Sequence, residues 1–173
     1  MFEATTGTPE ATGGFQIRWV FGRMTAAMRR QLVEFWLHEG ALESPDEAWR
    51  RSWEAACLLQ EQTGKVAGVC TVAIGLDDHQ RAYGYLRIFV AAANRRPGLN
   101  VRMVRKVVEG FECLATEPGA PQRLVATVEN PKIARRGGLR LLASVGFQSI
   151  GRTERGELLI ERPLAGQVTS TTA

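Results

Sequence analysis

A strand, a basic turn and an amphipathic helix follow one another directly in the middle of this sequence. The apolar run 83–92 predicts a buried strand, and apolar residues at helical spacing predict a helix over 101–116. The turn between them contains Arg95, Arg96 and Gly98. A chain with this order must build a sheet in which one strand ends at the start of a helix, with positive charge at the junction.

This junction has the properties of an anion-binding site. The first turn of a helix has unpaired N–H groups and the positive end of the helix dipole. Arg95 and Arg96 add positive charge, and Gly98 allows the backbone to approach a ligand closely. A pyrophosphate group fits these properties. The alternative is a solvated surface turn that carries two arginines, because runs of charge are usually solvated.

Positive charge is concentrated in this part of the chain. The formal net charge is +4, but residues 79–108 contain no Asp or Glu. Such a patch attracts a nucleotide cofactor, nucleic acid or an acidic protein surface. Nucleic acid ranks last of the three, because the region has few aromatic residues on which bases could stack. The basic residues of the two runs are Arg81, Arg87, Arg95, Arg96, Arg102, Arg105, Lys106, Lys132, Arg135, Arg136 and Arg140.

The length of 173 residues fits one domain, which we expect over 15–163, with flexible polar arms at 1–14 and 164–173. The sequence shows neither a signal-peptide pattern nor an apolar run of about 20 residues, so it predicts a cytoplasmic protein without a membrane span. Three widely spaced cysteines, Cys57, Cys70 and Cys113, are expected to be small core residues in a reducing compartment. Only two histidines are present, so we expect no metal site and no Ser-His-Asp triad.

The remaining pattern predicts a mixed α/β sheet of six to seven strands with helices on both faces. Ser44-Pro45-Asp46-Glu47 marks the start of a helix, with Ser44 as the N-cap. Trp49 and Trp53 are expected to face inward from that helix. The predicted order is β-α-α-β-β-β-α-β-α-β-β, with strands at 15–21, 57–62, 66–76, 83–92, 124–129, 147–152 and 158–162, and helices at 25–39, from 45, at 101–116 and from about 139.

This order resembles the GNAT family of N-acetyltransferases over 15–162. The family's fourth strand ends in Val and is followed by Gln/Arg-x-x-Gly-x-Gly/Ala, which is matched here by Val90 and then Arg95 to Asn100. Asn100 departs from the pattern, because the family has Gly or Ala there. An Asn after the fifth strand and a Gly-Phe pair after the fourth helix are matched by Asn130 and Gly146-Phe147.

The resemblance implies that the chain binds acetyl-CoA. In the family, the N–H groups of the basic turn hold the pyrophosphate, and the pantetheine arm lies where the fourth and fifth strands separate. Side chains such as Arg87, Phe89 or Leu142 would fill that gap in an inactive protein. The implied contacts are Val90, Ala91 and Ala92 through the backbone, and Arg95, Arg96, Gly98, Leu99, Asn100 and Val101 at the phosphates.

The catalytic residues of the family are less evident. Many members have a Glu on the fourth strand as base and a Tyr four residues before the Gly-Phe pair as acid. This chain has no acid on the strand 83–92, and it has Leu142 at the Tyr position. The residues that could substitute are Glu129, Tyr85 and Ser144, although Glu129 fits an ion pair, Tyr85 a core position and Ser144 the surface equally well.

Two functions therefore remain. The first is an acetyl-CoA-dependent N-acetyltransferase that acts on a small-molecule amine or a protein amine. The second is an inactive protein of the same fold that serves in structure, assembly or interaction, such as a viral structural or host-directed protein. In the second case the terminal arms would bind protein partners, and the protein would be associated with a virion. Fold alone does not decide between them.

Overall fold

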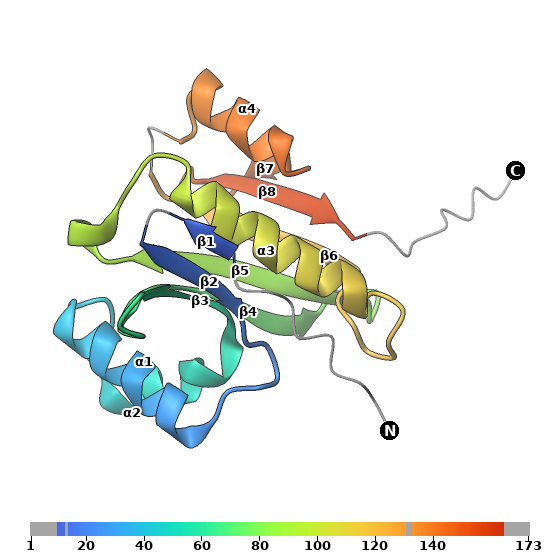
Figure 1. Ribbon diagram of the computed structural model, residues 1–173. Coiled ribbons are helices and arrows are strands. Elements are labelled where there is room, and N and C mark those ends of the chain that lie inside the picture. The colour runs from blue at the N-terminus through green and yellow to red at the C-terminus, as the bar shows by residue number, and fades with distance from the viewer. Residues whose placement is uncertain (1–9, 13, 131–132, 165–173) are drawn as a thin grey trace, which may run out of the picture.

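The computed structural model describes residues 10–12, 14–130 and 133–164. They form one mixed sheet with strand order β1-β2-β3-β4-β5-β6-β8-β7, with helices on both faces (Figure 1). The predicted α/β class and element order are confirmed. The strands are β1 Glu10–Thr12, β2 Phe15–Trp19, β3 Ala55–Glu61, β4 Val66–Leu76, β5 Ala82–Val90, β6 Arg123–Val128, β7 Gln148–Arg152 and β8 Leu158–Pro163. The helices are α1 Ala26–His38, α2 Pro45–Arg51, α3 Leu99–Leu114 and α4 Arg136–Ser144, with single 3-10 turns η1 Ser52–Glu54 and η2 Ala92–Asn94.

The structure adds an eighth strand to the six or seven predicted. Strand β1 pairs antiparallel with β2, and it lies in the segment 1–14 that was expected to be a flexible arm. Residues 1–9 and 13 of that arm and residues 165–173 of the C-terminal arm lie outside the described residues. Leu164, the first residue of the expected C-terminal arm, is buried in the core.

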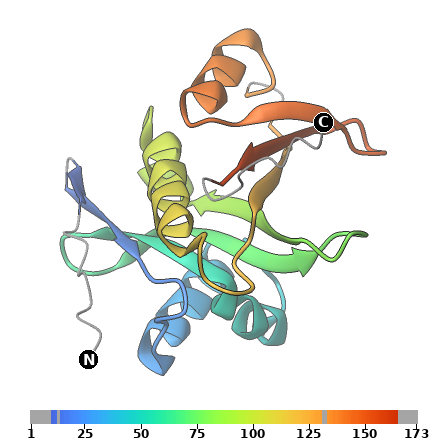
Figure 2. The same ribbon diagram turned by 90° about the vertical axis from the view of Figure 1, so that its right-hand side faces the viewer.

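Helices cover the two faces of the sheet unequally. Helices α1 and α2 pack on one face, and α3 lies along the other (Figures 1 and 2). Met103, Val107 and Phe111 of α3 are fully buried in the larger core cluster, which also takes in residues of β6 and β8. A second cluster lies under α1 and includes Leu32 and Trp36. Strand β4 is buried from Val66 to Val72, as a central strand apolar on both faces requires.

The start of α2 was predicted correctly, and those of α3 and α4 were predicted to within three residues. The Ser44 hydroxyl accepts a hydrogen bond from the Glu47 N–H at 3.3 Å, which confirms the predicted cap. Helices α3 and α4 begin two to three residues earlier than predicted, at Leu99 and Arg136. Neither needs a side-chain cap there.

Two expectations about burial were wrong. Trp49 and Trp53 face outward with 41% and 62% exposure, because the small residues Ala48 and Ser52 face inward instead. The indole rings stack on either side of the Arg29 guanidinium, at 3.8 and 3.7 Å from its central carbon to the ring centroids. The Arg29 Nε also donates to the Ser52 hydroxyl at 2.7 Å. Arg29 therefore fixes η1 against α1.

Two of the three cysteines are buried and one is exposed. Cys57 and Cys70 are buried, as expected, and burial raises the pKa of the Cys70 thiol well above its ordinary value. Cys113 is exposed on α3, which corrects the expectation that all three cysteines are core residues. Within the described residues, none of the helices is long and apolar enough to cross a membrane.

Gly110 of α3 allows the helix to approach β2 closely. A Cβ atom there would lie 2.4 Å from Cζ3 of the Trp19 ring, which is far inside van der Waals contact. The same ring packs edge-on against Phe111, with centroids 5.3 Å apart. Trp19 is therefore held from two sides and has little room to move.

We predict that Gly110→Ala destabilises the protein by about 1–2 kcal/mol, because the overlap with Trp19 outweighs the better helix propensity of Ala. Gly137→Ala is the matched control, since a Cβ atom at Gly137 of α4 meets nothing within 4 Å. The control should be neutral or stabilise by up to about 1 kcal/mol. Urea unfolding of both variants measures the difference, and equal effects would contradict this account of Gly110.

Candidate functional site

Strands β5 and β6 pair at one end and separate at the other. Their parallel pairing covers three residue pairs, the last of which joins Tyr85 to Val125. Strand β5 continues to Val90 and β6 to Val128 without further pairing between them. We call this point of separation the fork. Beyond it, the edge of β5 that faces β6 is open to hydrogen bonds from another group.

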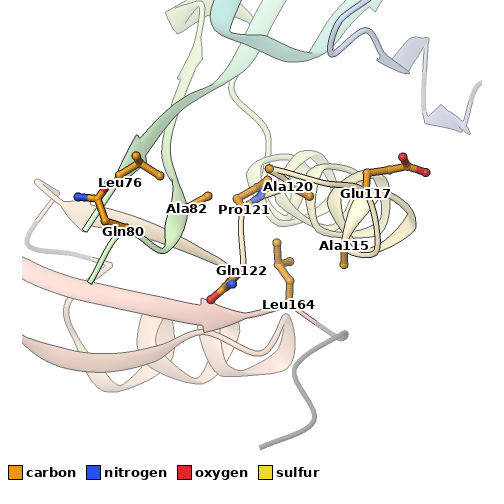
Figure 3. Close-up of a pocket in the computed structure, with 10 residues that line it drawn as sticks. Leu76, Gln80, Ala82, Ala115, Glu117, Ala120, Pro121, Gln122 and Leu164 are labelled. Atoms are coloured by element: carbon orange, nitrogen blue, oxygen red, sulfur yellow. The ribbon is translucent and has the colours of Figure 1, made fainter. Parts of the chain in front are cut away.

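A cavity of about 330 Å³ lies at the closed end of this pair of strands (Figure 3). Ala82 and Gln122 line it, together with Ala115 beyond the C-terminal end of α3. It therefore lies at the opposite end of α3 from the basic turn. A second hollow, of about 660 Å³, lies between α1 and the β3–β4 turn. Neither hollow is lined by any of the predicted site residues.

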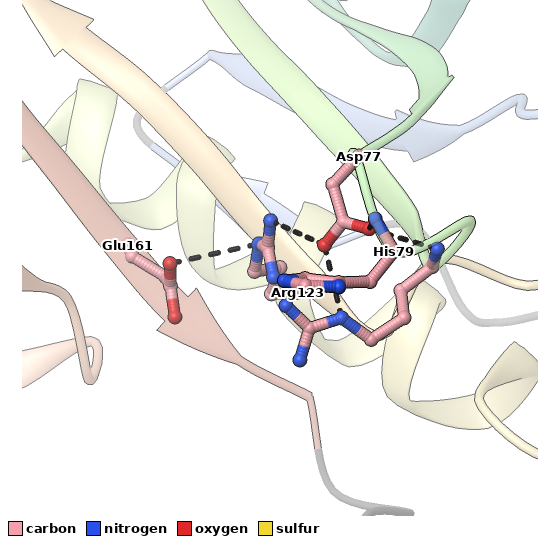
Figure 4. A network of polar contacts seen from close by, with 5 residues as sticks. Asp77, His79, Arg123 and Glu161 are labelled. Carbon is pink, nitrogen blue, oxygen red and sulfur yellow. Dashed lines mark hydrogen bonds and ion pairs between the residues drawn. The ribbon is translucent and has the colours of Figure 1, made fainter.

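An ionic cluster holds the closed end together (Figure 4). Asp77, in the turn between β4 and β5, accepts hydrogen bonds at 2.9 Å from the N–H groups of His79 and Arg81. Arg123 of β6 donates to the same carboxylate at 3.0 Å and lies 3.6 Å from Glu161 of β8. The hydrogen bond from the Arg81 N–H is the largest cause that lowers the pKa of Asp77, to about 2. Asp77 thus stays ionised and ties three strands together.

Two hydroxyl groups meet across the fork itself. The Tyr85 hydroxyl of β5 and the Thr127 hydroxyl of β6 are 2.6 Å apart and share a hydrogen bond. The Arg87 guanidinium lies over the Tyr85 ring, 4.5 Å from its centroid. Tyr85 is therefore placed where the strands separate, with its hydroxyl directed to β6. Thr127 was missed in the sequence, because a single Thr in a strand carries no signal of its own.

The side chains that could have filled the gap are directed elsewhere. Phe89 packs against Phe35 of α1, with ring centroids 5.8 Å apart. Arg87 forms an ion pair with Glu54 of η1 at 3.5 Å. Leu142 of α4 is partly buried against the larger core cluster. These placements leave the edge of β5 beyond Tyr85 uncovered by Arg87 and Phe89.

The basic turn presents unpartnered N–H groups. Gly98 has φ +78°, a left-handed conformation that suits glycine, and it caps the start of α3. The Leu99 N–H donates to the Arg96 carbonyl, and the Arg102 N–H donates to the Gly98 carbonyl. In the described part of the chain, the N–H groups of Gly98, Asn100 and Val101 donate to no backbone carbonyl. The anion site predicted from sequence depends on these three groups.

The two arginines of the turn contact the protein itself. The Arg95 Nε donates to the Val90 carbonyl at 3.1 Å, and the Arg96 guanidinium lies 4.9 Å from the Phe15 ring centroid. Ala91 is buried, and its N–H donates to Ala67. Ala92 is exposed at the start of η2. Val90 and Ala91 therefore already use backbone groups within the fold.

The remaining catalytic candidates are not brought together with Tyr85 by any contact in the structure. Glu129 directly follows β6 and is exposed. Ser144 is exposed at the end of α4, and its hydroxyl donates to the Leu141 carbonyl of the same helix at 2.6 Å. Among the described residues, no group of three or more His, Cys, Asp or Glu side chains could hold a metal ion.

No protein-family model and no curated protein sequence matches this chain. Solved structures do match it. A GNAT-family acetyltransferase from Streptococcus pneumoniae aligns with a TM-score of 0.63 at 19% identity, over 87% of this chain and 99% of that one. The chain has the GNAT fold.

Two further structures support this GNAT fold. A ribosomal-protein-S5-alanine acetyltransferase from Vibrio fischeri aligns with a TM-score of 0.65 at 13% identity, over 92% of this chain and 98% of that one. A phosphinothricin acetyltransferase of the GNAT superfamily from Sinorhizobium meliloti, in complex with acetyl-CoA, aligns with a TM-score of 0.62 at 16% identity. The alignment covers 92% of this chain and 94% of that one.

We predict that Asp77→Asn removes a pH-dependent part of the stability. The pKa of Asp77 is lowered from its ordinary 3.8 to about 2, so its contribution is present above about pH 4 and is lost as the pH falls toward 2. The difference in unfolding free energy between the wild type and Asp77→Asn should therefore shrink over that range. Urea unfolding at several pH values measures it, with the exposed neighbour Asp78→Asn as control. A difference that is constant with pH would contradict the prediction.

Proposed function

We propose that this protein is an acetyl-CoA-dependent N-acetyltransferase. The observation that carries the proposal is the coincidence, in a GNAT fold, of the fork with the unpartnered N–H groups at the start of α3. Of the matched structures, the Sinorhizobium meliloti protein contains acetyl-CoA. The proposed acceptor is an amine, either of a small molecule or of a protein.

The residues present fit a pyrophosphate. The N–H groups of Gly98, Asn100 and Val101 would donate to its oxygens at the positive end of the α3 dipole. Asn100 can do this through its backbone, although the family has a smaller residue there. The guanidinium groups of Arg95 and Arg96, which contact the Val90 carbonyl and the Phe15 ring, add positive charge. The open edge of β5 beyond Tyr85 would pair with an extended, amide-containing arm.

Acetyl-CoA would supply an activated acyl carbonyl: the C–N bond to the amine forms, the C–S bond breaks, and the sulfur leaves as a thiolate. One proton must leave the amine and one must reach the sulfur. We assign the Tyr85 hydroxyl as the donor of the proton that reaches the sulfur, because Tyr85 lies at the fork and Thr127 orients its hydroxyl. Glu129 follows β6 and would take the amine proton through water. Ser144 ranks third, because its hydroxyl is engaged within α4.

The comparisons give no support to the alternative of a structural or assembly protein. They concern acetyltransferases, at identities that establish the fold and leave the acceptor open. For the compartment, we propose the cytoplasm. The two buried thiols Cys57 and Cys70, which remain unpaired, suit a reducing environment.

We predict that Asn100→Pro weakens acetyl-CoA binding and that Asn100→Ala does not. Proline removes the Asn100 N–H, which has no partner within the first turn of α3, whereas Ala removes only the side chain. Loss of one hydrogen bond to a charged group costs about 1.5–3 kcal/mol, or roughly a 10- to 100-fold rise in Kd. Calorimetric titration with acetyl-CoA measures both variants. No binding to the wild type at millimolar acetyl-CoA would refute the proposed function.

We also predict that Tyr85→Phe lowers kcat by about 100-fold without weakening acetyl-CoA binding, because it removes the proton donor and leaves the ring in place. Tyr83→Phe is the matched control, since it removes the same hydroxyl from another tyrosine of β5. Thiol release from acetyl-CoA gives kcat, and calorimetry gives Kd. An unchanged kcat in Tyr85→Phe would exclude Tyr85 as the acid.

A further inference from the structure

A second polar cluster lies beside the fork, on the face of the sheet that α2 and η1 cover. Glu54 of η1 is its centre. Its carboxylate lies 3.5 Å from Arg87 of β5, 3.5 Å from Arg50 and 3.9 Å from Arg51 of α2. Thr71 of β4 lies beside Arg87 on the same face of the sheet, because the two residues are register partners. The cluster therefore connects α2 and η1 with the strand that forms one side of the fork.

Several buried polar atoms in this cluster have no hydrogen-bond partner among the described residues. They are Arg51 Nε, Glu54 Oε2 and the Thr71 hydroxyl, and they make up three of the five such atoms in that part of the chain. Thr71 is only 2% exposed. Arg51 Nε and Glu54 Oε2 still lie in the ion pairs described above, so the Thr71 hydroxyl is the atom for which a polar partner is missing.

Positive charge exceeds negative charge in the cluster. Three guanidinium groups, those of Arg50, Arg51 and Arg87, share two carboxylates, those of Glu47 and Glu54, which leaves one positive charge uncompensated. The pKa of Arg51 is lowered mainly by burial and then by Arg87, while Glu54 and Glu47 act in the opposite direction. An anion that binds the cluster would compensate this charge.

Arg87 is the exposed member of the cluster that lies on the strand of the fork, whereas Arg50, at 68% exposure, lies on α2. The Arg87 side chain is 44% exposed, whereas those of Arg51 and Glu54 are mostly covered. In the described structure the Arg87 guanidinium makes an ion pair with Glu54 and a ring contact with Tyr85, but no hydrogen bond. Its N–H donors are thus available in the geometry that suits a bidentate carboxylate.

The position of Arg87 relates this anion site to the reaction. Arg87 and Tyr85 lie on the same face of β5, two residues or about 7 Å apart along the strand. An acceptor whose carboxylate binds Arg87 would therefore place its amine close to the hydroxyl pair of Tyr85 and Thr127.

We propose that Arg87, supported by Arg51 and Glu54, binds a carboxylate of the acceptor, so that the acceptors are amines that also carry a carboxylate, as amino acids do. The assignment of this anion as part of an acceptor rests on the proposed acetyltransferase function. The existence of a carboxylate site at Arg87 does not, so the two can be tested separately.

The first experiment uses no acetyl-CoA. The side-chain Nε–H signals of arginine are followed by NMR while N-acetylglycine or N-acetylglycinamide is added; the two probes differ in the carboxylate. We expect a saturable shift with N-acetylglycine, at least about tenfold weaker binding of the amide, and a similar loss in Arg87→Gln. Arg87→Lys should retain part of the affinity, and the exposed Arg30→Gln of α1 should behave as the wild type.

Equal binding of the two probes, no saturable binding, or full binding in Arg87→Gln would overturn the carboxylate site. Thermal melting of each variant shows that it is folded, and Arg87→Lys provides a second variant if Arg87→Gln is not. This result is independent of whether the protein binds acetyl-CoA.

The second experiment tests the acceptor class. With acetyl-CoA present, thiol release is measured with methionine and with methioninamide. We expect methionine to be the better acceptor, and its KM to rise about tenfold in Arg87→Gln while that of methioninamide does not. A protein that binds acetyl-CoA but prefers the amide would overturn the acceptor assignment. A protein that does not bind acetyl-CoA would instead refute the proposed function.

Discussion

The pairing between β5 and β6 is the constraint on which the rest of this structure depends. It joins the two halves of the sheet, β1 to β5 and β6-β8-β7, over three residue pairs. Because the two strands are parallel, a crossover is needed between them, and α3 supplies it. The short pairing leaves the far end of β5 unpaired at the point where the basic turn leads into α3. The unpaired edge of β5 and the start of α3 are therefore adjacent.

Polar side chains compensate for the short backbone pairing. At the closed end, Asp77 and Arg123 link the β4–β5 turn to β6, and Glu161 extends the link to β8. At the fork, the Tyr85 and Thr127 hydroxyls hold the strands at the point of separation. Exposed ion pairs alone contribute little, but Asp77 accepts several hydrogen bonds at once and is fixed by its own turn.

Much of the fold could be predicted from the sequence, because its signals are local. The cap at Ser44, the left-handed Gly98 and the alternation of strand and turn each involve a few adjacent residues. The wrong expectation for Trp49 and Trp53 shows the limit of such signals. Helical spacing predicted a large apolar face, whereas the tight packing of α2 on α1 selected small inward residues and left the tryptophans to stack on Arg29.

Backbone geometry and neighbouring residues are enough to account for the order of the elements, the strand–turn–helix junction and the N–H groups at that junction. The tertiary structure alone decided where β5 and β6 part, that Tyr85 meets Thr127, and that Arg87 meets Glu54. Each of these contacts joins residues more than 30 positions apart, and their meeting depends on how the whole sheet twists and packs. No periodicity within either segment encodes such a contact.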